Sequence, residues 1–308
     1  MSQKLRVRVP ATTANLGPGF DTLGLALNLW NETDFTQRAD DRIVVTITGE
    51  GAAILPKDTH NTVAAAALRT FELAGEQPPG LTIDCHNRIP LSSGLGSSAA
   101  AVLTGILGAN AFLGEPLDQE ALLKLAVDIE GHPDNIAPAL LGGLVVCLTD
   151  GEVIHAHRLH PRADRQPIHI TMALPKFDLP TRAARAVLPA QVPHADAVFN
   201  LSRAVLVTEA LTTGDLDLLA EAMGDRLHQP YRLALIPGAQ AALDAARGAG
   251  AAAVALSGAG PSLAAFSAQE DPAIGEAMQR AFAAAVLNAR IFHLGVSDTG
   301  AEVINLGD

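Results

Sequence analysis

Alternating apolar and polar residues near the N-terminus predict β-strands. Residues 5–9 (Leu-Arg-Val-Arg-Val) and 42–48 alternate with a period of two, and residues 81–85 form another short run of this kind. Between the first two runs lies a turn-rich segment, residues 11–29, that ends in an apolar stretch. The first third of the chain is therefore expected to build a sheet.

Apolar residues spaced three and four positions apart predict helices between and after these strands. Residues 61–74 have this period, with Thr59 or Asn61 available as an N-cap. Residues 118–129 repeat it and stop at Glu130-Gly131, a typical helix end. A strand is expected next, over residues 140–148.

A polar segment rich in proline and arginine, residues 161–167, divides the pattern. We therefore expect two domains, residues 1–162 and residues 163–308. The second half mixes strands and helices in an α+β pattern. Its predicted strands are residues 168–174, 252–256, 263–266 and 290–294, and its predicted helices are residues 196–211, 237–249 and 272–286.

The composition narrows the class of protein. With 308 residues, 48% of them hydrophobic, the chain has enough apolar side chains for a sizeable core. A net charge of −12 without a basic run argues against nucleic acid as a partner. The apolar stretches are alanine-rich and interrupted, so no membrane span or signal core is predicted. The two cysteines, Cys85 and Cys147, are expected to be buried thiols in a reducing cytoplasm.

The strongest chemical signal is the stretch from Pro90 to Ala100, Pro-Leu-Ser-Ser-Gly-Leu-Gly-Ser-Ser-Ala-Ala. Gly94 and Gly96 allow a ligand to approach the backbone, and a helix begins at Ser97 and Ser98. A helix N-terminus exposes unpaired N–H groups and attracts anions. The stretch therefore points to a nucleotide phosphate.

Two other phosphate loops fit this stretch less well. A Walker A loop needs a Gly-Lys pair, and the chain has none. A dinucleotide fingerprint would read Gly94-x-Gly96-x-x-Ala99, but Pro90 argues against the strand that should lead into it. A glycine turn with an N-capping serine and no ligand is the remaining alternative.

Two polar clusters are candidates for a substrate site. Residues 10–24 carry Asn15 and Asp21 among glycines, as a substrate loop or as a plain β-turn with an Asx cap. Residues 130–138 (Glu-Gly-His-Pro-Asp-Asn-Ile-Ala-Pro) lie between a helix and a strand. A carboxylate there could help to bind Mg²⁺ beside nucleotide phosphates, or the cluster could be a polar loop.

Arginines and a late glycine turn complete the candidate chemistry. Arg182 and Arg185 lie on one helical face, where they form either a fork for a carboxylate or a solvated pair. Residues 225–232 add a further polar set. Residues 256–262 (Leu-Ser-Gly-Ala-Gly-Pro-Ser) form a tight turn that either closes over a ligand or simply reverses the chain.

Taken together, these segments resemble a known family. Residues 10–24, 90–100 and 256–262 are similar to the three motifs of the GHMP kinases, in the same order. Within that family the chain resembles the homoserine kinases, in its opening motif, its Glu-Gly-His-Pro-Asp-Asn cluster, Thr181-x-x-x-Arg185 and His228-Gln-Pro-Tyr-Arg232. The resemblance covers residues 5–295.

The resemblance implies a two-domain α+β fold, ribosomal-S5-like in its N-terminal, nucleotide-binding domain and ferredoxin-like in its C-terminal domain, which completes the substrate site. It implies ATP and Mg²⁺ as cofactors and L-homoserine as the substrate, phosphorylated on its side-chain hydroxyl in threonine biosynthesis. Dimers are common in the family, so a homodimer is left open.

The resemblance also implies roles for single residues. Ser98, or else Ser97, and Glu130 would hold Mg²⁺. Asn15, Asp21, His132 and Asn135 would face the substrate, Arg185 and Arg232 would bind its carboxylate, Thr181 would lie near the reacting groups, and Gly258 would support the substrate. ATP would contact Asn61, Val63, Pro90, Leu91, Ser92, Ser93, Gly94, Leu95, Gly96, Ser97, Ser98, Ala99 and Ala100.

The proton acceptor stays open at this point. Related kinases have an aspartate base where this branch has Asn135, and an amide does not accept a proton as a carboxylate does. Either the proton leaves late, to a phosphate oxygen or water, or Asp21 is the base. Three other functions are alternatives: a GHMP kinase for another alcohol such as mevalonate or a sugar, a non-catalytic sensor of ATP and a metabolite, and a NAD-binding oxidoreductase, which the missing lead strand disfavours.

Overall fold

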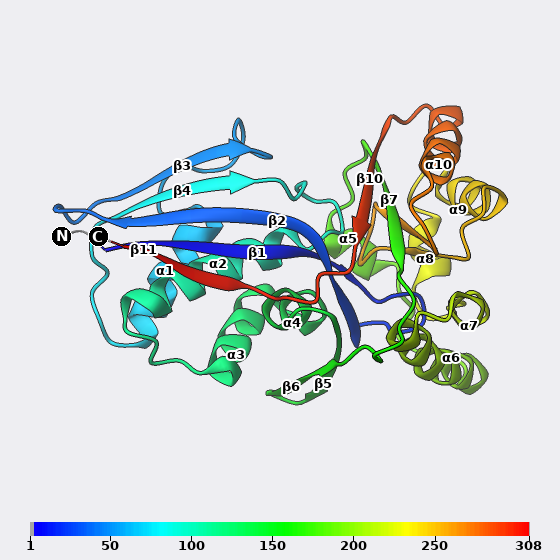
Figure 1. Cartoon of the computed structure of the whole chain (residues 1–308), viewed down its shortest axis with the longest axis horizontal. Coiled ribbons are helices and arrows are strands. Elements are labelled where there is room, and N and C mark those ends of the chain that lie inside the picture. Colours follow the sequence, from blue (N-terminus) through cyan, green and yellow to red (C-terminus); the bar gives the residue numbers. More distant parts are fainter. Residues whose placement is uncertain (1–2, 308) are drawn as a thin grey trace.

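The larger of two β-sheets is built from the N-terminal half of the chain and its last strand. The computed structural model describes residues 3–307 and shows this sheet as seven strands (Figure 1). The main path is β11-β1-β2-β4-β3, and β5 pairs with β2 and β6. The strands are β1 (Lys4–Ala14), β2 (Leu23–Gln37), β3 (Ile43–Gly49), β4 (Leu81–Asn87), β5 (Leu144–Asp150), β6 (Val153–Leu159) and β11 (Glu302–Gly307).

Alternation along β1 gives this sheet one apolar and one polar face. Leu5, Val7 and Val9 are buried, and Arg6 between them points to the other face. There its Nε donates to Oδ1 of Asp34 on the neighbouring strand, at 2.6 Å. The apolar face must therefore be covered by other elements.

Helices cover that face, on the lower side of the sheet in Figure 1. They are α1 (Thr62–Leu73), α2 (Ser97–Phe112), α3 (Gln119–Glu130) and α4 (Pro133–Leu141). Of the two candidate caps, Asn61 rather than Thr59 caps α1, by accepting a hydrogen bond from the backbone N–H of Val63. Asp118 caps α3 in the same way, and Gly131 ends it in the left-handed conformation.

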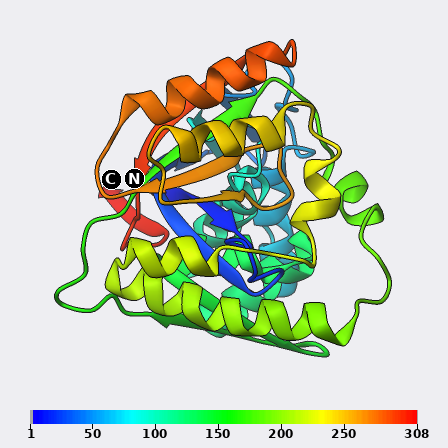
Figure 2. The same ribbon diagram turned by 90° about the vertical axis from the view of Figure 1, so that its right-hand side faces the viewer.

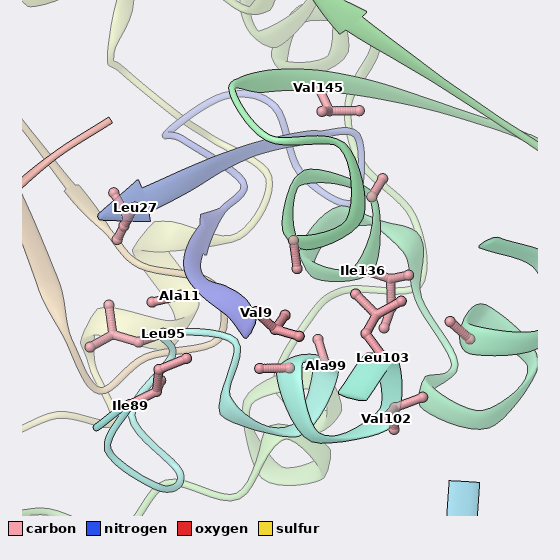
Figure 3. Packing of buried hydrophobic residues seen from close by; sticks show 14 of the residues in the cluster. Val9, Ala11, Leu27, Ile89, Leu95, Ala99, Val102, Leu103, Ile136 and Val145 are labelled. Atoms are coloured by element: carbon pink, nitrogen blue, oxygen red, sulfur yellow. The ribbon is translucent and has the colours of Figure 1, made fainter. Parts of the chain in front are cut away.

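Helix α2 lies at the centre of the first domain because two glycines let it approach its neighbours. A Cβ atom at Gly105 would overlap the carbonyl oxygen of Val63 on α1. A Cβ atom at Gly108 would lie 2.6 Å from the ring of Phe35 on β2. Figure 3 shows the apolar contacts that follow: Leu103 of α2 lies near Ile136 of α4.

The smaller sheet is antiparallel and has the order β10-β7-β9-β8. If its strands are numbered 1 to 4 along the chain, from β7 to β10, they lie side by side in the order 4-1-3-2, which is the order of a ferredoxin-like unit. Figure 2 shows α9 and α10 side by side on its outer face. The elements are β7 (His169–Pro175), β8 (Ala253–Leu256), β9 (Leu263–Ser267), β10 (Ala289–Gly295), α5 (Thr181–Ala186), α6 (His194–Thr213), α7 (Leu216–Ala222), α8 (Gln229–Leu233), α9 (Ala239–Gly248) and α10 (Pro272–Ala284).

Two local predictions were wrong. The strand expected over residues 140–148 begins only at Leu144, because α4 continues to Leu141 and two glycines at positive φ, Gly142 and Gly143, separate the two elements. The cluster 130–138 is not a loop throughout: α4 starts at Pro133, whose fixed φ suits the first helical position. Each of the other predicted helices and strands overlaps an observed element.

The division at residue 162 stays a prediction, but the strand pairing bears on it. The chain passes from one sheet to the other between Leu159 and His169. At the C-terminus it returns, because β11 pairs with β1 in the first sheet. The second domain is therefore connected to the first at both of its ends.

Within residues 3–307, none of the helices is long and apolar enough to cross a lipid bilayer.

The tight packing of α2 predicts an asymmetry between two helical glycines. Gly105→Ala should lower the free energy of unfolding by roughly 1–3 kcal/mol, the usual effect of overpacking. Gly248→Ala, at the end of α9 with nothing within 4 Å of an added Cβ, should leave it unchanged or raise it slightly. Urea unfolding of both variants checks this. Equal stability of the two variants would contradict the packing described for α2.

Candidate active site

A cavity of about 200 Å³ lies where the two domains meet. It brings together side chains from all the polar segments that the sequence singled out, although these segments span more than 200 positions of the chain. The predicted site residues that line it are Asn15, Asp21, Ser92, Ser93, Gly94, Gly96, Ser97, Ser98, Glu130, His132, Asn135, Thr181, Arg185, Arg232 and Gly258.

A second hollow, of about 220 Å³, adjoins the first through three shared serines, Ser92, Ser97 and Ser98. Asn61, Val63 and Leu91, all predicted, line it as well. The rest of its lining consists of residues that the sequence did not identify: Asn31, Thr33, Leu55, Thr62, Cys85, Asn87, Ala101 and Thr104. The side chain of Asn61 is already used in capping α1, where it also donates to the carbonyl of Pro56.

Four members of the predicted ATP loop do not reach either hollow. The side chains of Leu95, Ala99 and Ala100 are completely buried in the core. Pro90 lines a separate groove between the domains. These residues anchor the loop, and any contact they make with a nucleotide would have to come from their backbone.

The glycine loop is held open by backbone conformation and by other turns. Gly94 and Gly96 have φ of 77° and 71°, in the left-handed region where a side chain is strained. Gly96 is the N-cap of α2 and provides no side-chain cap for the first N–H groups of the helix, and Gly96, Ser97 and Ser98 line the cavity. Ser257 from the late glycine turn donates to the carbonyl of Gly94 at 2.7 Å.

Ser98 and Glu130 meet at the edge of the cavity. The hydroxyl of Ser98, in the first turn of α2, donates to Oε2 of Glu130, the last residue of α3, at 2.7 Å. Burial raises the pKa of Glu130, and the Ser98 hydrogen bond partly opposes that rise. A hydroxyl and a carboxylate beside a helix N-terminus form the oxygen donor set that Mg²⁺ prefers.

The first motif forms a strained loop that presents Asp21. Asn15 and Asp21 have φ of 71° and 53°. The amide of Asn15 is buried and satisfied within the protein, since Oδ1 accepts the N–H of Asp21 and Nδ2 donates to the carbonyl of Gly258. Asn15 therefore holds the first and third motifs together at the floor of the cavity.

Arg185 and Asp21 bind each other across the cavity. Two hydrogen bonds of 2.9 Å join the guanidinium on α5 to the carboxylate. This contact, with the nearby negative charges, raises the pKa of Arg185. Asp21, predicted to face the substrate, and Arg185, predicted to bind its carboxylate, are thus partners in this structure, and both side chains are more than one-third exposed.

Arg232 is a buried cation, and no carboxylate within residues 3–307 is hydrogen-bonded to it. Its side chain is 2% exposed and donates to the carbonyl oxygens of Ala184 and Gly258. Burial lowers the pKa of this guanidinium. The ring of Phe20 lies beneath it, with the ring centroid 5.0 Å from Cζ. A ligand carboxylate would supply the missing partner.

Asp134 is the principal residue that the sequence reasoning did not assign. It lines the cavity, is 3% exposed, and lies 3.2 Å from Nδ1 of His132. The Asp134 carboxylate raises the pKa of His132, so this imidazole keeps its positive charge to higher pH. The signal was present in the segment His-Pro-Asp-Asn, where Asp134 stands between two residues that were assigned.

Comparisons with known proteins agree with this site. The family model described as GHMP kinases N terminal domain matches residues 61–143, and the one described as GHMP kinases C terminal matches residues 207–285. A homoserine kinase from Moorella thermoacetica is 49% identical over 97% of this chain and 99% of its own length. One from Carboxydothermus hydrogenoformans is 41% identical over 97% of each chain.

Solved structures give the same result. A homoserine kinase from Cytophaga hutchinsonii superposes with a TM-score of 0.86 at 33% identity, covering 98% of both chains. A mevalonate kinase superposes with a TM-score of 0.70 at 14% identity and so shares the fold alone. The expected two-domain α+β fold is confirmed, and the chain belongs to the homoserine kinases of the GHMP kinase family.

Proposed function

We propose that this protein transfers the γ-phosphoryl group of ATP to the side-chain hydroxyl of L-homoserine, forming O-phospho-L-homoserine on the route to threonine. The observation that supports this most strongly is the composition of one cavity. Arg185 and Arg232 could bind the carboxylate of a zwitterionic amino acid, and two carboxylates of the same cavity, Asp21 and Asp134, could bind its ammonium group. These four side chains line the cavity beside the N-terminus of α2.

ATP binding would use the two adjoining hollows. The triphosphate would lie against the glycine loop and the first N–H groups of α2, where the helix dipole favours negative charge. The adenine would enter the second hollow beside Val63 and Leu91. The shared serines connect the two, so one nucleotide could span both.

Mg²⁺ fits the donor set of Ser98 and Glu130. The ion would neutralise phosphate charge during the transfer, and it needs few protein ligands because phosphate oxygens supply others. Ser98 rather than Ser97 is proposed, because its hydroxyl already contacts Glu130. The hydrogen bond between them would be exchanged for two contacts to the ion.

Recognition of homoserine would rest on charge. The substrate carboxylate would bind Arg232 and Arg185, and its ammonium group would bind Asp21 or Asp134. Binding would then replace the Asp21–Arg185 ion pair with contacts to the substrate. His132 and Thr181 line the same cavity and would lie beside the reacting hydroxyl. A substrate lacking the ammonium group would leave a carboxylate without a partner, which disfavours mevalonate.

The chemistry requires mainly positioning and charge neutralisation. Asn135 would orient the hydroxyl, and the proton would leave late, to a phosphate oxygen or to water. Asp21 remains the alternative base, although its carboxylate accepts two hydrogen bonds from Arg185 in this structure and would bind the ammonium group in the proposed complex. We also propose that the protein is cytoplasmic and forms a homodimer. Gel filtration with light scattering would test the oligomeric state.

The activity itself is tested by ADP release from Mg²⁺-ATP in the presence of L-homoserine, mevalonate, galactose or no acceptor. Turnover with L-homoserine alone is the expected result. Turnover with another alcohol would show that the protein is a kinase with a different substrate. ATP binding without turnover would support a sensor instead.

Arg185→Ala should weaken homoserine binding without affecting ATP. Losing a charged hydrogen bond should raise the apparent KM for homoserine by about 10- to 150-fold, from roughly 1.5–3 kcal/mol. Arg182→Ala, an exposed residue of the same helix, should behave as the wild type. Steady-state kinetics with each substrate varied in turn measures both. An unchanged homoserine KM in Arg185→Ala would exclude the carboxylate contact.

Glu130→Gln should raise the Mg²⁺ concentration needed for half-maximal rate by roughly tenfold or more, since a neutral amide is a poor ligand for a hard cation. Glu120→Gln, at the exposed start of the same helix, is the matched control. The rate measured against Mg²⁺ concentration at fixed ATP distinguishes the two variants. Full activity of Glu130→Gln at limiting Mg²⁺ would show that Glu130 is not a ligand.

The raised pKa of Glu130 predicts a pH effect with a definite sign. A carboxyl group binds Mg²⁺ only when it is ionised, so the apparent Mg²⁺ affinity should fall as pH drops through a pKa above the usual value for glutamate. In Glu130→Gln this dependence should disappear. Mg²⁺ titrations of the wild-type protein and of Glu130→Gln at several pH values, corrected for the ionisation of ATP itself, compare the two. A dependence that survives in the variant would assign it to another group.

A further inference from the structure

Thr12 is a buried hydroxyl that the proposed mechanism does not use. It lies in β1 with no exposed surface, and it does not line the cavity. Its Oγ1 donates to Oδ1 of Asn135 at 2.8 Å. This contact joins the first strand to the first turn of α4, across 123 positions of the chain.

Thr12 also touches the phosphate loop. Its backbone N–H donates to the carbonyl of Leu95 at 3.1 Å. A Cβ atom at Gly96 would overlap the Thr12 hydroxyl and lie 3.3 Å from Oδ1 of Asn135. The hydroxyl therefore fills the space between the N-cap of α2 and the amide of Asn135, with no room for another side chain.

The neighbours of Asn135 distinguish the two ends of its amide. Oδ1 accepts from Thr12, and Nδ2 points toward Oδ1 of Asp134, at 3.5 Å. Rotating the amide by half a turn would bring its oxygen against the Asp134 carboxylate, so that two acceptors face each other. It would also remove the acceptor of a buried hydroxyl. Both contacts therefore favour the same orientation.

We propose that Thr12 is a positioning residue that fixes the amide of Asn135 with its N–H₂ group facing the reacting atoms. This rests on the proposed kinase function. In this orientation Asn135 is a hydrogen-bond donor, to the substrate hydroxyl oxygen or to an oxygen of the transferred phosphoryl group. It does not accept the hydroxyl proton, which agrees with a late departure of that proton to phosphate or water.

The residue next to it provides a matched control. Thr13 is also buried in β1, and its hydroxyl is hydrogen-bonded to that of Ser257 at 2.9 Å. Replacing either threonine by valine removes one buried hydroxyl at nearly constant volume. Thr12→Val and Thr13→Val should therefore lose similar amounts of thermal stability, but only the first should act through Asn135.

The test is a double-mutant cycle between Thr12 and Asn135, measured as kcat with L-homoserine. Thr12→Val should lower kcat by roughly tenfold, less than the loss of a whole transition-state donor, with both KM values within about twofold. Thr12→Ser, which keeps the hydroxyl, should restore most of kcat. In an Asn135→Ala background Thr12→Val should change kcat by less than about twofold, whereas Thr13→Val should have the same effect in both backgrounds.

Three results would overturn the proposal: a wild-type kcat in Thr12→Val, no rescue by serine, or additive effects of Thr12→Val and Asn135→Ala. A wild-type protein that does not phosphorylate L-homoserine would instead refute the function on which it rests.

Discussion

The site depends on backbone hydrogen bonds among three turns that are distant in the sequence. The N–H of Thr12 donates to Leu95, that of Gly258 to Ala14, and that of Ser262 to Ser93. These contacts close the first motif, the phosphate loop and the late glycine turn into one unit. Because the contacts are between main chains, the turns must approach closely, and bulky side chains would keep them apart.

This constraint explains why small residues crowd the motifs. A Cβ atom at Gly94 would lie 2.9 Å from the carbonyl oxygen of Gly260 and even nearer to that of Ser257. The same closeness leaves the first turn of α2 uncovered, since no side chain is available to cap it. The geometry that joins the domains is therefore also the geometry that leaves N–H groups free for a phosphate.

An acidic protein that binds ATP must concentrate its positive charge. Here the net charge is −12, yet Arg185, Arg232 and the start of α2 all face one cavity. Arg232 donates its hydrogen bonds to carbonyl oxygens rather than to carboxylates, so the nearby Asp21, Asp134 and Asp225 offset its charge only from a distance. The cavity can thus attract an anion although the molecule as a whole repels it.

Sequence reasoning located the glycine loop and the charged residues because their chemistry is local. It predicted that a helix begins at Ser97, and the structure agrees. It missed Thr12 and Asp134, whose importance comes from neighbours far along the chain. It also missed the wall formed by Asn31 and other strand residues, because a polar side chain in a strand does not reveal which face it occupies. The strand predicted at residue 140 failed since apolar residues at a helix end and at a strand start look alike.

The pairing of β11 with β1 has a consequence for how the molecule is made. Lys4 and Arg8 lie opposite Gly307 and Glu302, so the first and last described strands are neighbours in one sheet. During synthesis β1 can pair with β2 at once, but β11 becomes available only after residues 169–295, which contain the second sheet, have been made. One margin of the first domain is thus an open edge during translation, and that domain is completed only after the second one has emerged.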